Sequence, residues 1–176
     1  KKAEAGIMIT ASHNPPRYNG IKLKGSFGGS ALPEQARQVE ALLERNQRSA
    51  RGPNVMDLQK ALDMGLVQRF DPAWEYYRHI SHLIDLDTVS KGELHVVSDA
   101  MYGSGRGAFR DLLSRTRCNL HEIRGDMNPG FGGIHPEPMG HYLQALRAAI
   151  QTYHADVGVA TDGDADRIGA MDERGV

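Results

Sequence analysis

Residues 156–171 read DVGVATDGDADRIGAM, and this stretch decides the fold class. Small and β-branched apolar residues from Asp156 to Ala160 are typical of a buried strand, and Ile168 to Met171 predicts a second strand after a polar loop. Upstream, predicted strands and helices alternate along the chain. They are a strand at 94–97, a helix opened by residues 103–107 that runs to about 114, a strand at 118–123, and a helix from Pro138 to about 153. Strands that alternate with helices indicate an α/β fold: a mostly parallel sheet with helices on both faces, in three α/β/α layers.

The beginning of the chain holds too few elements for a domain core of its own. Strands are predicted at 6–10 and 21–24, and Pro33, at a first helical position, begins an amphipathic helix to about Arg48. We therefore expect a piece of a longer protein, with the C-terminal part of one such domain followed by a second. The expected parts are 1–58, a linker at 59–72, and a second domain at 73–176. The second domain opens with a helix whose apolar face comprises Trp74, Tyr77, Ile80, Leu83 and Ile84.

The composition excludes several classes of protein. Of 176 residues, 40% are apolar and 24% are charged, as in a globular chain that buries a sizeable core. No apolar run approaches the ~18 residues of a membrane span, so no membrane contact is expected. The single cysteine, Cys118, cannot form an internal disulfide, which favours a reducing cytoplasm. The net charge of −1, without a dense basic face, argues against nucleic-acid binding.

The loop between the last two predicted strands carries the strongest chemical signal. Asp162, Asp164 and Asp166 alternate with glycine and alanine, which let the backbone curl until the three carboxylates converge. Adjacent carboxylates repel one another unless a hard cation such as Mg²⁺ or Ca²⁺ lies between them. Arg167 follows directly, and a guanidinium pairs well with phosphate oxygens. The loop therefore predicts a cation site beside an anionic ligand, and its plain alternative is a solvated acidic turn.

Two known motifs with glycine- or acid-rich loops, the EF-hand and the dinucleotide-binding loop, are alternative interpretations of parts of this sequence. An EF-hand needs acids at positions 1, 3, 5 and 12 and glycine at position 6, but Arg167 occupies the glycine position and strands flank the loop. Residues 103–108 match the glycine pattern of a dinucleotide-binding loop, which would make the protein an NAD-binding oxidoreductase. However, residues 99–102 separate the predicted strand from Gly103, whereas that turn must be tight. A glycine-rich helix start that packs closely on the sheet is the alternative.

Ser12 lies in a polar turn, ASHNPPRYNG at residues 11–20, directly after the first predicted strand. Loops that follow strands of α/β sheets often hold functional groups, so Ser12 is a candidate nucleophile. The adjacent His13 is poorly placed as its base, because neighbouring side chains seldom face each other, and there is no G-x-S-x-G elbow. Equally open is that Ser12 and Asn14 only form a turn before the two prolines. Lys22 is either a functional cation on the next strand or a plain exposed lysine.

Two motifs taken together resemble the α-D-phosphohexomutase superfamily. They are TASHNPP at 10–16 with YNGIK at 18–22, and DGDADR at 162–167. The segment NPGFGGIHPEP at 128–138 resembles the family's stretch between them. The threonine-led, Pro-Pro form of the serine loop resembles the phosphoglucomutase/phosphomannomutase branch more than the phosphoglucosamine mutases.

The resemblance implies an isomerase that transfers phosphoryl groups and interconverts hexose 1-phosphate and hexose 6-phosphate. A hexose 1,6-bisphosphate would be both its intermediate and its activator. Ser12 would carry the phosphoryl group, with an oxygen of that group joining the three loop aspartates around one Mg²⁺. Arg167 would steady the phosphate, Lys22 would act as general acid/base near the sugar, and His13 and Asn14 would line the site. The expected partner is thus a small sugar phosphate.

The family is built of four domains, so the resemblance also implies what this sequence lacks. It would hold the tail of the first domain and nearly all of the second, without the sugar-recognition loop of the third or the phosphate-anchoring loop of the fourth. We therefore expect the isolated chain to be inactive, and to self-associate through uncovered apolar surface on residues 6–48. A non-catalytic metal- or phosphate-binding module is the alternative of another class. A phosphate that bridges Ser12 and the cation requires the hydroxyl within roughly 7 Å of the carboxylates.

Overall fold

The computed structural model describes residues 2–176 of the chain. The chain divides into two units, and each is described by itself. One unit comprises Ile21–Ala73 and the residues up to Met8, and the other comprises Ile9–Gly20 and Trp74–Val176. The loop that carries Ser12 therefore groups with the second part of the chain. Among the described residues, no helix is both long enough and apolar enough to cross a membrane.

The first unit is built from short elements. In chain order they are β1 (Ala5–Ile9), β2 (Ile21–Gly25), α1 (Pro33–Arg48) and α2 (Leu58–Asp63), with β1 and β2 paired in a two-stranded sheet. α1 has the predicted bounds, because Pro33 suits a first helical turn and the Leu32 N–H donates to Gln35 Oε1 (2.9 Å). α2 begins one residue before the stretch predicted as a linker (59–72) and otherwise lies within it. The Asp57 carboxylate caps it by accepting from the Lys60 N–H (2.9 Å).

The apolar surface expected on the first unit is exposed. Ile7, Ile21 and Leu43 are each more than half exposed, and α1 contains no buried residue. The cause is the small number of elements, since two strands and two helices cannot cover one another's apolar faces. Self-association through this surface stays a prediction.

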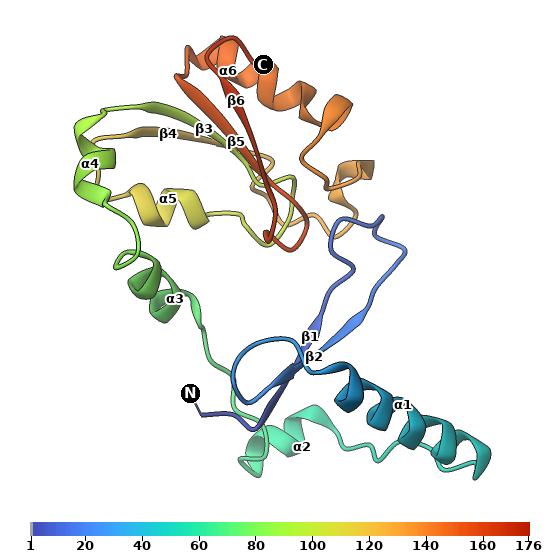
Figure 1. The fold of residues 1–176 in the computed structure, drawn as a ribbon. Helices are drawn as coiled ribbons and strands as arrows, with labels where there is room; N and C mark the ends of the chain where they lie inside the picture. Colours follow the sequence, from blue (N-terminus) through green and yellow to red (C-terminus); the bar gives the residue numbers. More distant parts are fainter. Residues whose placement is uncertain (1) are drawn as a thin grey trace. The chain divides into compact units, whose positions relative to one another are not determined.

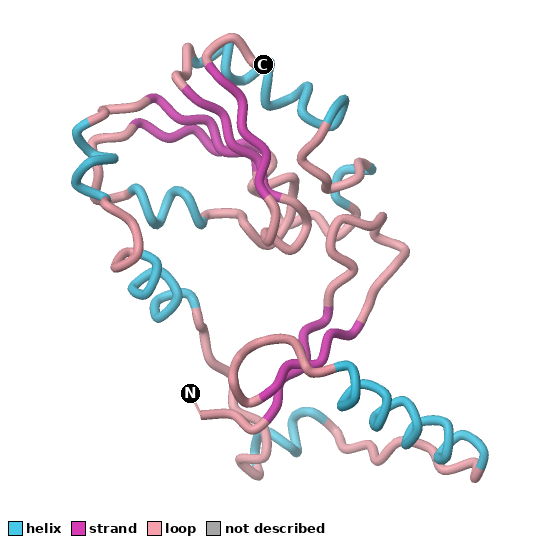
Figure 2. Tube along the Cα trace, viewed as in Figure 1, coloured by secondary structure: helices cyan, strands magenta, loops and turns pink. Residues whose placement is uncertain are grey.

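The second unit is an α/β domain around a four-stranded sheet (Figure 1). Its elements are α3 (Ala73–Ile80), α4 (Leu86–Lys91), β3 (His95–Asp99), α5 (Ala108–Leu113), β4 (Asn119–Ile123), η1 (Phe131–Gly133), η2 (Gly140–Leu143), α6 (Gln144–Tyr153), β5 (Val157–Thr161) and β6 (Ile168–Asp172). The strand order is β4-β3-β5-β6, with β3 parallel to β4 and to β5, and β6 antiparallel to β5 (Figure 2). The loop between β5 and β6 is too short for a parallel crossover, which needs about a dozen residues. The predicted mostly parallel α/β sheet is confirmed.

Helices lie on both faces of this sheet (Figure 1). On one face α6 packs against β3 and β5, where Leu146 and Ile150 are fully buried together with Val97. Gly158 in β5 permits this close packing, because a Cβ there would lie 2.4 Å from Ile150 Cδ1. α5 lies on the other face and contacts β4. The layers leave the C-terminal ends of β3 and β5 together at one edge of the sheet, since the two strands are parallel neighbours.

The helix predicted from Pro138 begins later than expected. The α-helix starts only at Gln144, after the 3₁₀ turn η2, because Met139 is extended (φ −148°, ψ 154°). Pro138 instead passes close to β6, where a Cβ on Gly169 would lie 2.7 Å from the Pro138 carbonyl oxygen. This tertiary contact, rather than the local preference of proline for a helix start, fixes the backbone here.

The helix predicted around Trp74 is shorter than expected. α3 ends at Ile80, and a turn follows in which the Leu83 N–H donates to the Ile80 carbonyl (2.8 Å). Asp85 then caps α4, a helix that the sequence did not predict, so Leu83 does not continue the face of α3. Trp74 is 65% exposed and Leu83 67% exposed, and the predicted apolar face is therefore not buried within the described residues.

A buried ion pair stabilises the edge of the sheet from which the polar loops emerge. Asp99, the last residue of β3, is almost fully buried and accepts from Arg124 Nε (2.8 Å) and from the Met101 N–H (3.0 Å). Arg124 follows β4, and its Nη2 also donates to the Tyr142 carbonyl (3.1 Å). A buried charge is tolerated only when it is paired and hydrogen-bonded. The pair therefore fixes the ends of β3 and β4 and the segment before α6 relative to one another.

Candidate active site

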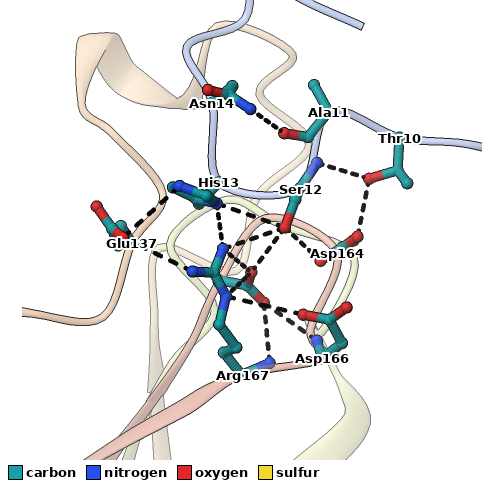
Figure 3. A network of polar contacts seen from close by, with 10 residues as sticks. Thr10, Ala11, Ser12, His13, Asn14, Glu137, Asp164, Asp166 and Arg167 are labelled. Atoms are coloured by element: carbon teal, nitrogen blue, oxygen red, sulfur yellow. Dashed lines mark hydrogen bonds and ion pairs between the residues drawn. The ribbon is translucent and has the colours of Figure 1, made fainter. Parts of the chain in front are cut away.

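The loop that carries Ser12 lies against the β5–β6 loop within the second unit (Figure 3). The Thr10 N–H donates to the Gly20 carbonyl (3.0 Å) at the base of the loop, and the Asn14 N–H donates to the Ala11 carbonyl (3.1 Å) at its tip. Ser12 itself has a left-handed backbone (φ 56°), which is uncommon for a residue with a Cβ. This tight turn directs the Ser12 hydroxyl toward the carboxylates that follow β5.

The Ser12 hydroxyl lies close to two of the predicted carboxylates. Ser12 Oγ is 3.4 Å from Asp162 Oδ2 and 3.4 Å from Asp164 Oδ1. Both distances are well below the limit of roughly 7 Å that a bridging phosphate allows. Two polar segments that lie about 150 residues apart in the sequence thus form one cluster.

The three loop aspartates converge as their alternating spacing predicts. One oxygen of each of Asp162, Asp164 and Asp166 lies within 4.8 Å of the others. Asp162 is fully buried, and its Oδ1 accepts the backbone N–H groups of Asp166 (3.1 Å) and Arg167 (3.2 Å), which curls the loop. Oxygens bound to Mg²⁺ at about 2.0–2.1 Å lie at most about 4.2 Å apart, so the cluster needs only a small contraction. This all-oxygen, anionic donor set suits a hard divalent cation.

Arg167 is the cationic centre of the cluster (Figure 3). Its Nη2 donates to Ser12 Oγ (3.1 Å) and its Nε donates to Asp162 Oδ2 (3.0 Å). The guanidinium therefore lies beside the hydroxyl and a carboxylate at once, where its fork could also pair with phosphate oxygens. His13 contacts Arg167 through Nδ1, and the same nitrogen is 3.5 Å from Ser12 Oγ. On the other side of the ring, His13 Nε2 lies 3.7 Å from Glu137 Oε1.

The remaining two predicted site residues are Asn14 and Lys22. Asn14 points away from the cluster, and its side-chain amide donates to the Ala11 carbonyl (2.8 Å), as in the turn alternative for this loop (Figure 3). Lys22 lies in β2, which belongs to the other unit. The functional roles of both residues stay predictions.

Thr10 and Glu137 belong to the cluster, although the sequence did not single them out. Thr10 Oγ1 donates to Asp164 Oδ2 (2.9 Å) and accepts from the Ser12 N–H (2.8 Å). Glu137 Oε1 lies 3.7 Å from Arg167 Nη1 as well as from His13. Both residues stand inside the quoted motifs at 10–16 and 128–138, but a motif does not tell which of its side chains point inward.

The glycine-rich stretch before α5 packs against the carboxylate loop. A Cβ on Gly103 would lie 2.8 Å from the carbonyl oxygens of Asp162 and of Gly163. The Ser104 N–H donates to the Gly163 carbonyl (3.0 Å). These glycines therefore serve close internal packing, which favours the packing interpretation of residues 103–108 over a dinucleotide-binding loop.

Comparison with known families identifies the chain. Residues 74–175 match the family model described as phosphoglucomutase/phosphomannomutase, alpha/beta/alpha domain II, and residues 1–50 match the model for domain I. The fold is thus that of the α-D-phosphohexomutase superfamily, as the resemblance of the motifs implies. Within it, the chain belongs to the phosphoglucomutase/phosphomannomutase family.

Two curated relatives are named phosphoglucosamine mutases. The phosphoglucosamine mutase of Halalkalibacterium halodurans is 34% identical over 178 residues, which cover 98% of this chain and 36% of that protein. The phosphoglucosamine mutase of Anoxybacillus flavithermus is 33% identical with the same coverage. This chain therefore spans only about a third of the length of the curated relatives that it matches.

Solved structures share the fold. A protein from Thermus thermophilus designated a phosphomannomutase has a TM-score of 0.85 and 31% identity, covering 99% of this chain and 38% of that one. The N-acetylphosphoglucosamine mutase of Aspergillus fumigatus, solved in complex with GlcNAc-6P and magnesium, has a TM-score of 0.58 and 19% identity, covering 98% of this chain and 44% of that one.

The two site loops approach each other closely at Gly163, which yields a test of the site's geometry. A Cβ at this position would lie 2.4 Å from the Ser12 carbonyl oxygen, so any side chain must push the loops apart. If the full-length protein has the phosphohexomutase activity that its family implies, Gly163→Ala should lower kcat by about 10²-fold, the cost of a displacement of about 1 Å in an active site. Steady-state kinetics measures this effect.

Gly52→Ala is the matched control for this substitution. A Cβ added to Gly52 would have no neighbouring atom within 4 Å, so this variant should keep the turnover of the unmodified protein. Equal kcat values for Gly163→Ala and Gly52→Ala would show that the two loops need not approach this closely.

Proposed function

We propose that the protein to which this chain belongs interconverts hexose 1-phosphate and hexose 6-phosphate. In this proposal Ser12 carries a phosphoryl group and a hexose 1,6-bisphosphate is the intermediate. The observation that supports it is the position of Ser12 Oγ, 3.4 Å from carboxylate oxygens of Asp162 and Asp164 and 3.1 Å from Arg167 Nη2. Phosphoryl transfer requires mainly positioning and charge neutralisation from the protein, and this arrangement offers both.

Each half-reaction moves one phosphoryl group between Ser12 and the sugar. The bond between phosphorus and Ser12 Oγ breaks as phosphorus bonds to the free hydroxyl oxygen of the hexose phosphate, and the hydroxyl proton passes to a base. After the bisphosphate has turned around, Ser12 Oγ accepts the other phosphoryl group and the released sugar oxygen regains a proton. We assign this proton exchange to Lys22, because the resemblance of the YNGIK motif to the family implies a general acid/base at that position.

The charges of the cluster suit a phosphoserine, which carries about −1.5 to −2 charge at neutral pH. Asp162, Asp164 and Asp166, with an oxygen of the phosphoryl group, would hold one Mg²⁺. When bound, the cation supplies charge neutralisation and orientation of the phosphoryl group. Arg167 would pair with phosphate oxygens, and His13 would line the same site. The hexose 1,6-bisphosphate would also act as activator, because it phosphorylates Ser12.

The branch of the superfamily is a separate question. The threonine-led serine loop favours the phosphoglucomutase/phosphomannomutase type. A phosphoglucosamine mutase is the second candidate, favoured by the names of the two curated relatives. ³¹P NMR distinguishes them, using the full-length protein, Mg²⁺, a trace of glucose 1,6-bisphosphate and the phosphates of glucose, mannose and glucosamine in turn.

We expect this experiment to show interconversion of the 1- and 6-phosphates of glucose or mannose. A marked preference for glucosamine phosphate would establish the second candidate. No interconversion of any of the three would contradict the mutase proposal and favour a non-catalytic module that binds metal or phosphate.

The isolated chain, residues 1–176, is expected to have no appreciable activity in the same assay. The matched family models describe domains I and II, and the chain covers 36% of the length of the Halalkalibacterium halodurans relative. Groups that bind the sugar and its second phosphate would then come from elsewhere in the full-length protein. Turnover by the isolated chain at a rate near that of the full-length protein would contradict this expectation.

A further inference from the structure

We propose that Thr10 is a positioning residue that sets the geometry between Ser12 and Asp164. The inference rests on the proposed function and extends it to a side chain that touches neither sugar nor phosphoryl group in that mechanism. Thr10 directly follows β1, two residues before Ser12, and its side chain points into the cluster (Figure 3).

The Thr10 hydroxyl joins the two loops of the site directly. Its Oγ1 donates to Asp164 Oδ2 (2.9 Å) and accepts from the Ser12 N–H (2.8 Å). Both distances are those of well-formed hydrogen bonds. The hydroxyl thus donates to the β5–β6 loop and accepts from the serine turn. Asp164, its partner in the β5–β6 loop, lies 154 residues after Thr10 in the sequence.

The first consequence concerns the orientation of Asp164. Because Oδ2 is occupied by Thr10, the other oxygen, Oδ1, is the one that faces Ser12 Oγ at 3.4 Å. Rotation of the carboxylate would break the bond to Thr10. The hydroxyl therefore presents a single carboxylate oxygen to the place where a cation and the phosphoryl oxygens would meet.

The second consequence concerns the backbone of Ser12. Its left-handed conformation (φ 56°) is costly for a residue with a Cβ and persists only when surrounding contacts determine it. The bond from the Ser12 N–H to Thr10 Oγ1 is one such contact, at the strained residue itself. Loss of the Thr10 hydroxyl would release the serine turn and the carboxylate together.

Valine and serine at position 10 separate the hydroxyl from the shape of the side chain. Thr10→Val keeps the branched shape and removes both hydrogen bonds, whereas Thr10→Ser keeps the hydroxyl and removes only the methyl group. Thr152→Val is the matched control, because the Thr152 hydroxyl donates only within its own helix, to the Ala148 carbonyl (2.8 Å). Thr10→Ala is a second variant that removes the hydroxyl without adding a buried methyl group.

In the full-length protein we expect Thr10→Val and Thr10→Ala to lower kcat by about 10- to 100-fold, while KM for the hexose phosphate changes by less than about threefold, as for loss of a group that orients a ligand. The dissociation constant for Mg²⁺, measured by calorimetric titration, should rise several-fold in both variants. Thr10→Ser should recover most of the loss, and Thr152→Val should match the unmodified protein in kcat, KM and Mg²⁺ affinity.

Three outcomes would overturn the inference. They are equal kcat and Mg²⁺ affinity in Thr10→Val, Thr10→Ala and the unmodified protein, a Thr10→Ser variant as impaired as Thr10→Val, or a loss that appears only in KM. Failure of the proposed function has a different signature, which is absence of turnover in the unmodified protein. In that case the Mg²⁺ titration of the same variants still decides whether Thr10 positions Asp164.

Discussion

We expect the replacement of Ser12 by alanine to abolish the proposed hexose phosphate turnover in the full-length protein. We expect kcat to fall by about 10⁴-fold or more, because loss of the nucleophile removes the covalent route and leaves only stabilisation by the surrounding groups. The carboxylates keep their other contacts, since Asp162 is held by Arg167 and Asp164 by Thr10. The affinity for Mg²⁺ should therefore fall by less than about tenfold, because the three aspartates remain and only the phosphoryl oxygen is lost from the proposed ligands.

A matched variant shows whether the loss of turnover is specific to Ser12 or follows from the loss of any exposed serine hydroxyl. Ser114 follows α5, is exposed, and donates its hydroxyl to the Asp111 carbonyl (2.8 Å), so Ser114→Ala should keep full turnover. Both variants are compared by steady-state kinetics and by calorimetric titration with Mg²⁺. Turnover that survives in Ser12→Ala would remove Ser12 from the role of nucleophile.

The substitution Asp164→Asn is expected to have the second-largest effect. Asp164 faces the Ser12 hydroxyl with Oδ1 and accepts from Thr10 with Oδ2. The amide keeps the size of the side chain but removes the negative charge that strengthens binding of a hard cation, and its NH₂ group cannot accept the hydrogen bond that Thr10 donates to Oδ2. We expect the dissociation constant for Mg²⁺ to rise by about 10- to 100-fold or more. The accompanying loss in kcat should be about 10³-fold, as for other preorganised electrostatic contacts.

Asp126→Asn provides the control for charge alone. Asp126 is exposed in the loop after β4, so its neutralisation changes the net charge by the same amount without altering the cluster. Its Mg²⁺ affinity and kcat should equal those of the unmodified protein. If Asp164→Asn bound Mg²⁺ as tightly as Asp126→Asn, Asp164 would not be a metal ligand.

Elements with a clear hydrophobic period could be predicted from the sequence. β5 and β6 are short apolar runs on either side of a polar loop, and α1 carries a proline at its start and arginines in its last turn. α2 and α4 were not predictable in the same way, because each has only six residues and therefore too few turns to show a period. Their aspartate caps, Asp57 and Asp85, are the local signals that the sequence does contain.

The start of α6 shows the limit of local rules. A proline followed by a periodic apolar pattern favours a helix start, yet Pro138 lies close to Gly169 of β6 and the next residue, Met139, is extended, so the helix begins later. In the same way, the ion pair joins Asp99, which ends β3, to Arg124, which follows β4. Only the assembled sheet brings such residues together.

The residues of the candidate site also differ in whether the sequence alone could mark them. Ser12 and the loop aspartates could be predicted because each follows a strand and each belongs to a motif of suitable chemistry. The inward orientation of Thr10 and Glu137 could not, since it depends on how the two loops meet. For Asn14 the sequence left a functional and a turn-forming role open, and the bond of its amide to the Ala11 carbonyl accounts for the second.

The most direct test of the central proposal is to follow the phosphoryl group on Ser12. Tandem mass spectrometry of the peptide that contains Ser12, from the purified full-length protein, would locate it before and after mixing with excess hexose 1-phosphate. We predict that Ser12 is phosphorylated at the start and that this phosphoryl group passes to the sugar. With hexose 1-phosphate that carries ¹⁸O in its phosphate, the phosphoryl group found on Ser12 after turnover should carry the label. An active protein in which Ser12 is never phosphorylated, or in which its phosphoryl group stays on the protein during turnover, would contradict the proposed mechanism.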